Sequence, residues 1–338
     1  GPLFATPRTA TVSYEIGFSA YFGDSASTLF IYSAIYFTLV MLVSLYPHKI
    51  LDTVGYVLSP LKILSLLILG ITAFIIPTGT ISPAIHNYVN SPVSEGFING
   101  YLTMDTLGAL VFGIVIINAI RSRGVTDKKL ITRYAVWASL ISGIGLTLVY
   151  LSLFKLGMGS HDVAANASNG AIILHAYVQH AFGGFGSVFL AAMIFIACLV
   201  TAIGLTCACA GYFEQITKIH YRRWVFILVG FAFGISNLGL TKLIAVSVPI
   251  LSAIYPPAIV VILLSFFWGL FRIPTRVIAP TAAVALFFGI IDAMKAADLA
   301  RFLPTSLTNL PLSEQNLAWL IPALLIFVFA AIRDRMKK

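Results

Sequence analysis

Long apolar runs, separated by short polar segments, follow one another along the whole chain. Ten of them approach or exceed the length of about 20 residues that an α-helix needs to cross a bilayer. They predict an all-α fold, a polytopic transmembrane helix bundle that forms a single membrane domain over residues 1–338. We place the spans at 1–21 (incomplete), 28–46, 57–77, 103–120, 134–157, 183–211, 223–238, 241–270, 277–293 and 316–332.

The composition supports the same assignment. Of the 338 residues, 59% are hydrophobic and only 10% are charged, and the mean hydropathy is +0.97. A soluble domain carries about 25% charged residues, and no water-soluble packing hides so large an apolar surface. The lipid bilayer is therefore the expected solvent of this chain, and no soluble domain or low-complexity tract interrupts the spans.

The net charge of +9 raises the question of a nucleic-acid partner. Sixteen of the 21 Lys and Arg residues fall in one alternate set of loops and at the C-terminus, and only three fall in the other set. Cytoplasmic loops of membrane proteins carry this excess of positive charge. The charge therefore reflects topology: we expect the C-terminus in the cytoplasm and no nucleic-acid partner.

The sequence contains no signature of an enzyme. Metalloprotease, nucleophile-elbow, P-loop and Rossmann patterns do not occur in it. The three cysteines, Cys198, Cys207 and Cys209, share one apolar segment, and their spacing is not that of a zinc site. We interpret them as small packing residues, and we expect neither a catalytic group nor an obligate protein partner.

The stretch YLTMDTLGALVFGIVIINAIRSRG, residues 101–124, is the most informative one. Gly108 and Gly113 bracket four residues in the middle of a span. Glycine lets the backbone leave helical geometry, and an unwound segment offers its N–H and C=O groups to a zwitterion and a cation. Alternatively, the two glycines only permit close helix packing. Residue spacing alone leaves both interpretations open.

Two further polar residues lie in that span. Asp105 opens it, where a carboxylate satisfies free N–H groups and meets the positive end of the helix dipole; a coupling role is the alternative. Asn118 lies deeper, and a hydrogen bond to a neighbouring helix accounts for it as well as a functional role does.

The stretch FIACLVTAIGLTCACAGYF, residues 195–213, carries Thr201 and Thr206 in an otherwise apolar span. A threonine hydroxyl can bond back to its own helix, or it can act as a hard oxygen ligand for a small cation. At the start of the chain, Arg8 and Glu15 are seven residues apart and share one helix face. Such charges need protein or water beside them, and we expect Pro7 to remove a backbone bond that neighbours must replace.

Four stretches together resemble the bacterial branched-chain amino acid:cation symporters. They are GPLFATPRTATVSYEIG, YLTMDTLGALVFGIVIINAIRSRG, NGAIILHAYVQHAFGG and IACLVTAIGLTCACA. The resemblance covers essentially the whole chain. It implies a leucine-transporter-type fold of inverted repeats in a bacterial inner membrane, and a chain that begins within the third span and lacks the first two. It also implies a secondary transporter that imports leucine, isoleucine and valine with sodium by alternating access.

The resemblance also implies the site residues. The unwound part of the sixth span corresponds to Gly108, Ala109, Leu110, Val111, Phe112 and Gly113, with Phe112 as an aromatic wall for the substrate. The sodium site corresponds to the Cys198 carbonyl and the Thr201 hydroxyl; Ala202 stands where a second hydroxyl is usual, so Thr206 is a substitute and the cation can be Na+ or H+. The alternatives are a proton-coupled carrier, a carrier of another amino acid, or a non-transporting receptor or scaffold.

Overall fold

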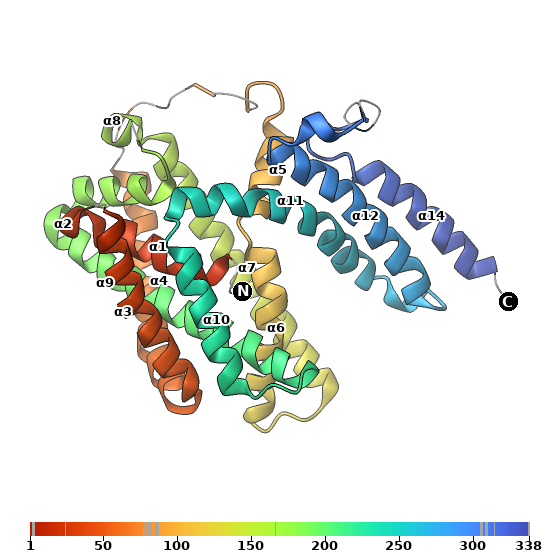
Figure 1. Cartoon of the computed structure of the whole chain (residues 1–338), viewed down its shortest axis with the longest axis horizontal. Coiled ribbons are helices and arrows are strands. Elements are labelled where there is room, and N and C mark those ends of the chain that lie inside the picture. Colours follow the sequence, from red (N-terminus) through yellow and green to blue (C-terminus); the bar gives the residue numbers. More distant parts are fainter. Residues whose placement is uncertain are drawn as a thin grey trace. The chain divides into compact units, whose positions relative to one another are not determined.

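The computed structural model describes residues 1–336 except 2–3, 24, 77–78, 80, 82, 85–87, 166, 305–306, 308–309 and 314; the side chains of residues 47–59 and 101 also lie outside the description. All regular elements in the described residues are helices, so the predicted all-α class is confirmed (Figure 1). In chain order they are α1 (Ala5–Gly17), α2 (Ser19–Phe22), α3 (Ala26–Leu45), α4 (Pro47–Ile75), α5 (Pro92–Leu102), α6 (Asp105–Ser122), α7 (Lys128–Met158), α8 (His161–Ala164), α9 (Gly170–Ile216), α10 (Tyr221–Ser236), α11 (Leu240–Ser265), η2 (Trp268–Leu270), α12 (Pro274–Ala296), η3 (Ala300–Phe302) and α14 (Leu320–Met336).

Each predicted span overlaps at least one of these helices. In the described residues, six helical segments are long and apolar enough to cross a membrane by length and composition: α3, the α5–α6 segment Pro92–Ser122, α7, α9, α11 and α12. The number of ten spans stays a prediction, as does the inverted-repeat arrangement.

Several helices begin at caps that the sequence carries. The Ser25 hydroxyl accepts a hydrogen bond from the Thr28 N–H at 3.2 Å before α3, and Asp127 accepts one from the Lys129 N–H at 3.0 Å before α7. Asn169 accepts from the first N–H groups of α9. Each side chain satisfies N–H groups that have no partner inside the helix.

The contacts divide the chain into two compact units. Unit 1 consists of Gly1–Pro83 and Val111–Leu243, and unit 2 of Ala84–Leu110 and Ile244–Lys338. Each unit has buried clusters of its own, so each is described by itself.

The centre of unit 1 is built by α1, α3, α9 and α10. Its fully buried side chains include Tyr36 and Val40 of α3, Ala202 of α9 and Val225 of α10. The contact of α1 with α9 is very close: a Cβ atom at Gly17 would lie 3.0 Å from the Cβ of Ala191. Small residues at a helix interface permit such an approach inside a membrane.

The centre of unit 2 is the packing of α11, α12 and α14. Val260, Ala285 and Trp319 lie in its buried cluster, one from each of these helices or the turn before them. Asp334 near the end of α14 accepts hydrogen bonds from the backbone N–H groups of Arg272 at 2.7 Å and Ile273 at 3.2 Å. Its carboxylate therefore lies just before the start of α12, where a negative charge is favourable.

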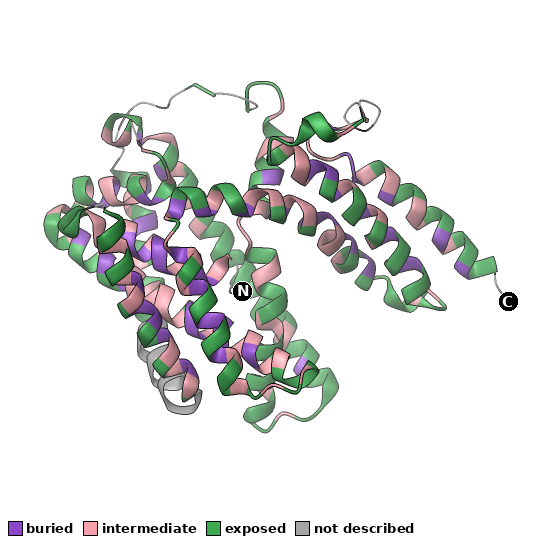
Figure 2. Ribbon diagram, viewed as in Figure 1, coloured by how far each residue is buried: buried purple, intermediate pink, exposed green. Residues whose placement is uncertain are grey.

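Exposed residues occur along the long helices (Figure 2), and many of them are large and hydrophobic. Ile31 of α3 is 59% exposed, Ile141 of α7 is 68% exposed and Phe185 of α9 is 86% exposed. A soluble protein rarely exposes such continuous apolar surface. The exposed surface therefore fits lipid, as expected for a multi-pass membrane protein.

Candidate functional site

Helix α6 runs without interruption through residues 108–113. The interruption predicted there is wrong for this structure. Neither Gly108 nor Gly113 has a positive φ, and an isolated glycine costs a helix only about 1 kcal/mol relative to alanine, which is too little to end it. Whether these residues bind substrate is a separate question and stays a prediction.

The interruption lies at residues 103–104, between α5 and α6. Met104 has a φ of 72°, a conformation that is uncommon for residues other than glycine. The Thr103 hydroxyl lies within 2.7 Å of the Gly100 carbonyl and 3.1 Å of the Asp105 carboxylate, and it bonds to both. Asp105 lies in the first turn of α6, near the positive helix end; that its carboxylate caps the helix stays a prediction. Its coupling role is untested, and Asn118 is exposed on the same helix.

Phe112 of α6 lies directly against α9. A Cβ atom at Gly204 would be 3.3 Å from the Phe112 ring, closer than ordinary van der Waals contact, so the glycine lets the ring approach the helix closely. Thr201 precedes Gly204 by three residues and shares its face of the helix. The structure therefore brings the predicted aromatic wall to the part of α9 in which the sodium site was predicted.

The predicted sodium ligands of α9 differ in their surroundings. Thr201 is exposed, and its hydroxyl donates to the Ala197 carbonyl at 2.8 Å, which leaves the oxygen lone pairs available. Thr206 is buried, two residues beyond Gly204 and on another face. Cys198 packs against the buried cluster of unit 1, and Ala202 is fully buried. Of the two threonines, Thr201 is the one on the face of Phe112; its cation role stays a prediction.

The structure shows the surroundings of the two charged residues of α1. Arg8 and Glu15 are both half-buried, and the Glu15 carboxylate accepts a hydrogen bond from the Asn169 amide at 2.6 Å. Glu15 is thus joined to the residue that caps α9. Pro7 lies in the first turn of α1, where a helix leaves its N–H groups unbonded in any case, so the expected loss of a bond is wrong.

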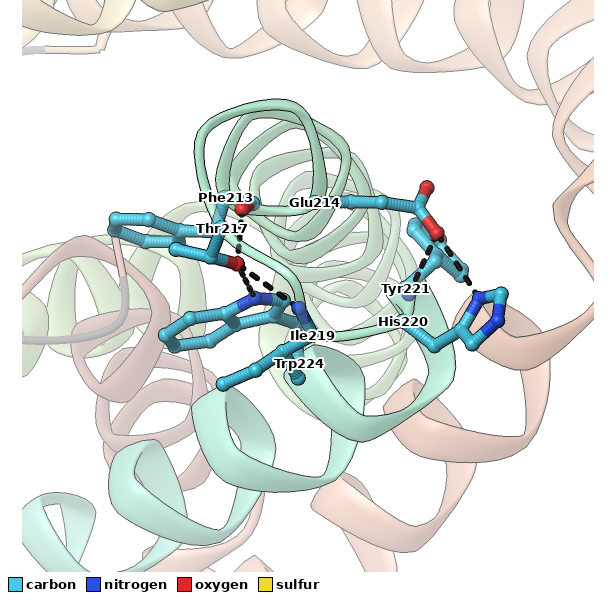
Figure 3. A network of polar contacts seen from close by, with 7 residues as sticks. All are labelled: Phe213, Glu214, Thr217, Ile219, His220, Tyr221 and Trp224. Atoms are coloured by element: carbon cyan, nitrogen blue, oxygen red, sulfur yellow. Dashed lines mark hydrogen bonds and ion pairs between the residues drawn. The ribbon is translucent and has the colours of Figure 1, made fainter.

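A polar network at the turn from α9 to α10 was not predicted from the sequence (Figure 3). The Thr217 hydroxyl accepts from the Trp224 indole N–H at 2.9 Å and donates to the Phe213 carbonyl at 2.6 Å. On the other side of the turn, the Glu214 carboxylate accepts from the Tyr221 N–H at 2.8 Å. These bonds join the end of α9 to the start of α10. A Thr and a Glu flanking a turn are too common in sequences to predict such a network.

A small, partly open cavity lies between α4 and α7 and is lined by Leu69, Gly70 and Ser152 among others. Its volume is about 10 Å³, enough for one water molecule. A shallow groove of about 360 Å³ lies on α7 beside Gly143 and Thr147. Neither is lined by residues 108–113, so neither identifies a substrate pocket.

Comparison with known proteins adds to this geometry. Residues 1–337 match the family described as "Branched-chain amino acid transport protein". A similar protein of Pseudomonas aeruginosa, named "Branched-chain amino acid transport system 3 carrier protein", is 60% identical over 99% of the chain and 77% of its own length. "Branched-chain amino acid permease BrnQ" of Escherichia coli is 59% identical over 99% and 76%, and the permease BraB of Bacillus subtilis is 40% identical over 96% and 74%. No solved structure matches.

Proposed function

The chain belongs to the family of branched-chain amino acid transport proteins, and on that premise we propose that it imports leucine, isoleucine and valine together with sodium by alternating access. The membership confirms the resemblance and the expectation of a carrier rather than an enzyme. The proposal adds the cation, the mechanism, the inner membrane of a bacterium and a cytoplasmic C-terminus.

The contact of Phe112 with Gly204 is the observation that carries the proposal. An aromatic ring offers an apolar wall to an aliphatic side chain. The Thr201 hydroxyl lies on the same face of α9, and hydroxyl and carbonyl oxygens are suitable ligands for a hard cation such as sodium. Substrate and cation would therefore bind close together, which is what their coupling requires.

One cation per amino acid is enough to drive uptake. A hundredfold leucine gradient opposes import by about 2.7 kcal/mol, since each tenfold is about 1.4 kcal/mol. One positive charge that crosses a potential of 100 mV supplies about 2.3 kcal/mol. A tenfold cation gradient adds about 1.4 kcal/mol, so the two together exceed the requirement.

The test is uptake of labelled leucine by the full-length protein in proteoliposomes, with sodium replaced by choline at fixed pH. We expect uptake to require sodium. Uptake that does not depend on sodium but depends on the pH gradient would show proton coupling instead. Uptake of other amino acids only would show another substrate, and binding without uptake would show a receptor.

A pair of threonine variants tests the position of the cation. Thr201→Ala removes the hydroxyl on the Phe112 face, and we expect it to raise the sodium concentration for half-maximal uptake at least tenfold, equivalent to about 1.4 kcal/mol. Thr206→Ala, on another face of α9, serves as the matched control and should change it much less. Equal effects of the two variants would contradict the placement.

A further inference from the structure

A buried carboxylate in unit 2 has no role in the function proposed so far. Asp292 of α12 is only 2% exposed, and neither of its carboxylate oxygens has a hydrogen-bond partner in the part of the chain that the structure describes. A buried charge without a partner is strongly unfavourable.

The nearest basic side chain does not neutralise Asp292 directly. Lys295, three residues further along α12, acts on it electrostatically, but the Lys295 ammonium group donates a hydrogen bond to the Ser313 hydroxyl. No ion pair joins the two among the described residues. The carboxylate therefore needs another positive partner.

The helix packed against this part of α12 has two backbone carbonyls without their usual donors. Pro256 and Pro257 lie inside α11, and a proline has no N–H to bond the carbonyl four residues earlier. The carbonyls affected are those of Ser252 and Ala253. In a bilayer, carbonyls freed in this way must find another partner.

The same two carbonyls face α12 at Gly289. A Cβ atom there would lie 2.8 Å from the Ala253 oxygen and 3.2 Å from the Ser252 oxygen. Gly289 is three residues before Asp292, so the two residues share one helix face. Carbonyl oxygens and an unpaired carboxylate are thus presented within about one turn of each other along the contact of α11 with α12.

We propose that Asp292, with the freed carbonyls of Ser252 and Ala253, forms a second binding site for a small monovalent cation, either sodium or a proton. Carboxylate and carbonyl oxygens are the ligands that hard cations prefer, and a cation supplies the charge that Asp292 lacks. The site lies wholly in unit 2, whereas Thr201 belongs to unit 1. Only its part in uptake rests on the proposed function; binding itself does not.

The titratable groups on the helices near Asp292 do not supply the positive charge that its carboxylate lacks. On α11 the nearest is Tyr255, whose ring is fully buried. On α5, which contacts α11 through Ile98, the Glu95 carboxylate accepts from the Asn99 amide at 3.0 Å. In the described part of α14, the first charged residue is Arg333. It lies next to Asp334, which bonds to the chain just before the start of α12, whereas Asp292 lies near the end of α12.

The experiment is binding of radioactive sodium to the purified protein without amino acid, in a Thr201→Ala background that weakens the other proposed site. Asp292→Asn keeps the side-chain shape and removes the charge. We expect it to raise the half-saturating sodium concentration at least tenfold. Asp298→Asn is the matched control, because Asp298 is exposed and its φ of 59° suits asparagine as well; sodium binding should not change in it.

The proton is tested in the same variants by thermal unfolding in sodium-free choline buffer across pH. If Asp292 holds a proton in the folded protein, stability is greatest at low pH and declines as pH rises, and Asp292→Asn removes this dependence while Asp298→Asn retains it. Loss of either the sodium or the pH dependence in Asp292→Asn supports the site and names its cation. Retention of both overturns it.

A second variant keeps the test decisive if Asp292→Asn does not fold. Lys295→Gln leaves the carboxylate in place and removes the competing positive charge, so sodium or proton binding should tighten severalfold. Unchanged binding of both in Lys295→Gln would overturn the proposal. If leucine uptake fails to depend on sodium while Asp292 still binds a cation, only the proposed function is refuted.

Discussion

Helices α1 and α7 of unit 1 show how differently two helices of one membrane protein can be built. Eight of the 13 residues of α1 are buried, and most of them are small or carry a hydroxyl, as Ala10, Ser13 and Gly17 do. Only two of the 31 residues of α7 are buried, Ile131 and Leu156. The helix with the greater number of large aliphatic side chains is the more exposed one.

The difference in burial between α1 and α7 is expected for a protein surrounded by lipid. Lipid tails are as apolar as leucine, so burying a large aliphatic side chain gains little inside a bilayer. Close approach and hydrogen bonds hold the helices together instead: Ser13 bonds to the Tyr32 hydroxyl at 2.7 Å, and Tyr36 donates to the Thr9 hydroxyl at 3.1 Å. Small and hydroxylated residues therefore mark the buried face.

The largest effect should come from adding volume to the α1 interface. Gly17→Val would place new atoms against Ala191, and overpacking of this kind costs about 2 kcal/mol. Gly145→Val on α7 is the matched control, because no atom lies within 4 Å of a Cβ there. Thermal unfolding in lipid nanodiscs, followed by labelling of the half-buried cysteines, measures both. Equal melting temperatures would contradict the comparison.

A smaller effect is expected from one hydrogen bond. Tyr36→Phe keeps the ring and removes the hydroxyl that donates to Thr9, which should destabilise the protein by about 1 kcal/mol. Tyr134→Phe on α7, where the side chain is 48% exposed, should leave the melting temperature unchanged. A larger loss in the α7 variant would show that α7 is covered by protein.

The smallest effect should come from trimming the exposed face of α7. Ile141 is 68% exposed, so in Ile141→Ala lipid fills the space and we expect a change within about 0.5 kcal/mol. The same unfolding assay in nanodiscs measures it. A loss of the size seen for buried core residues would indicate that a protein surface covers Ile141 in the membrane.

The sequence predicted the positions of the helices better than it predicted the local structure of the candidate sites. Length and hydropathy placed a helix in every predicted span, because apolar runs of this length have no other stable form in lipid. The glycines at 108 and 113 suggested an interruption that lies instead at Met104, because glycine permits a departure from helical geometry without requiring one. Asp292 was passed over, since one acid near a span end says nothing about its neighbours.

By itself, the sequence determined the solvent, the helical class and, through its resemblance and the relatives it matches, the transport family. Those properties depend on composition and on patterns that are local along the chain. Only the tertiary structure decided that Phe112 meets Gly204 and that Gly289 meets the carbonyls beside Pro256. Such contacts join residues far apart in sequence, and their positions depend on packing within a few ångströms.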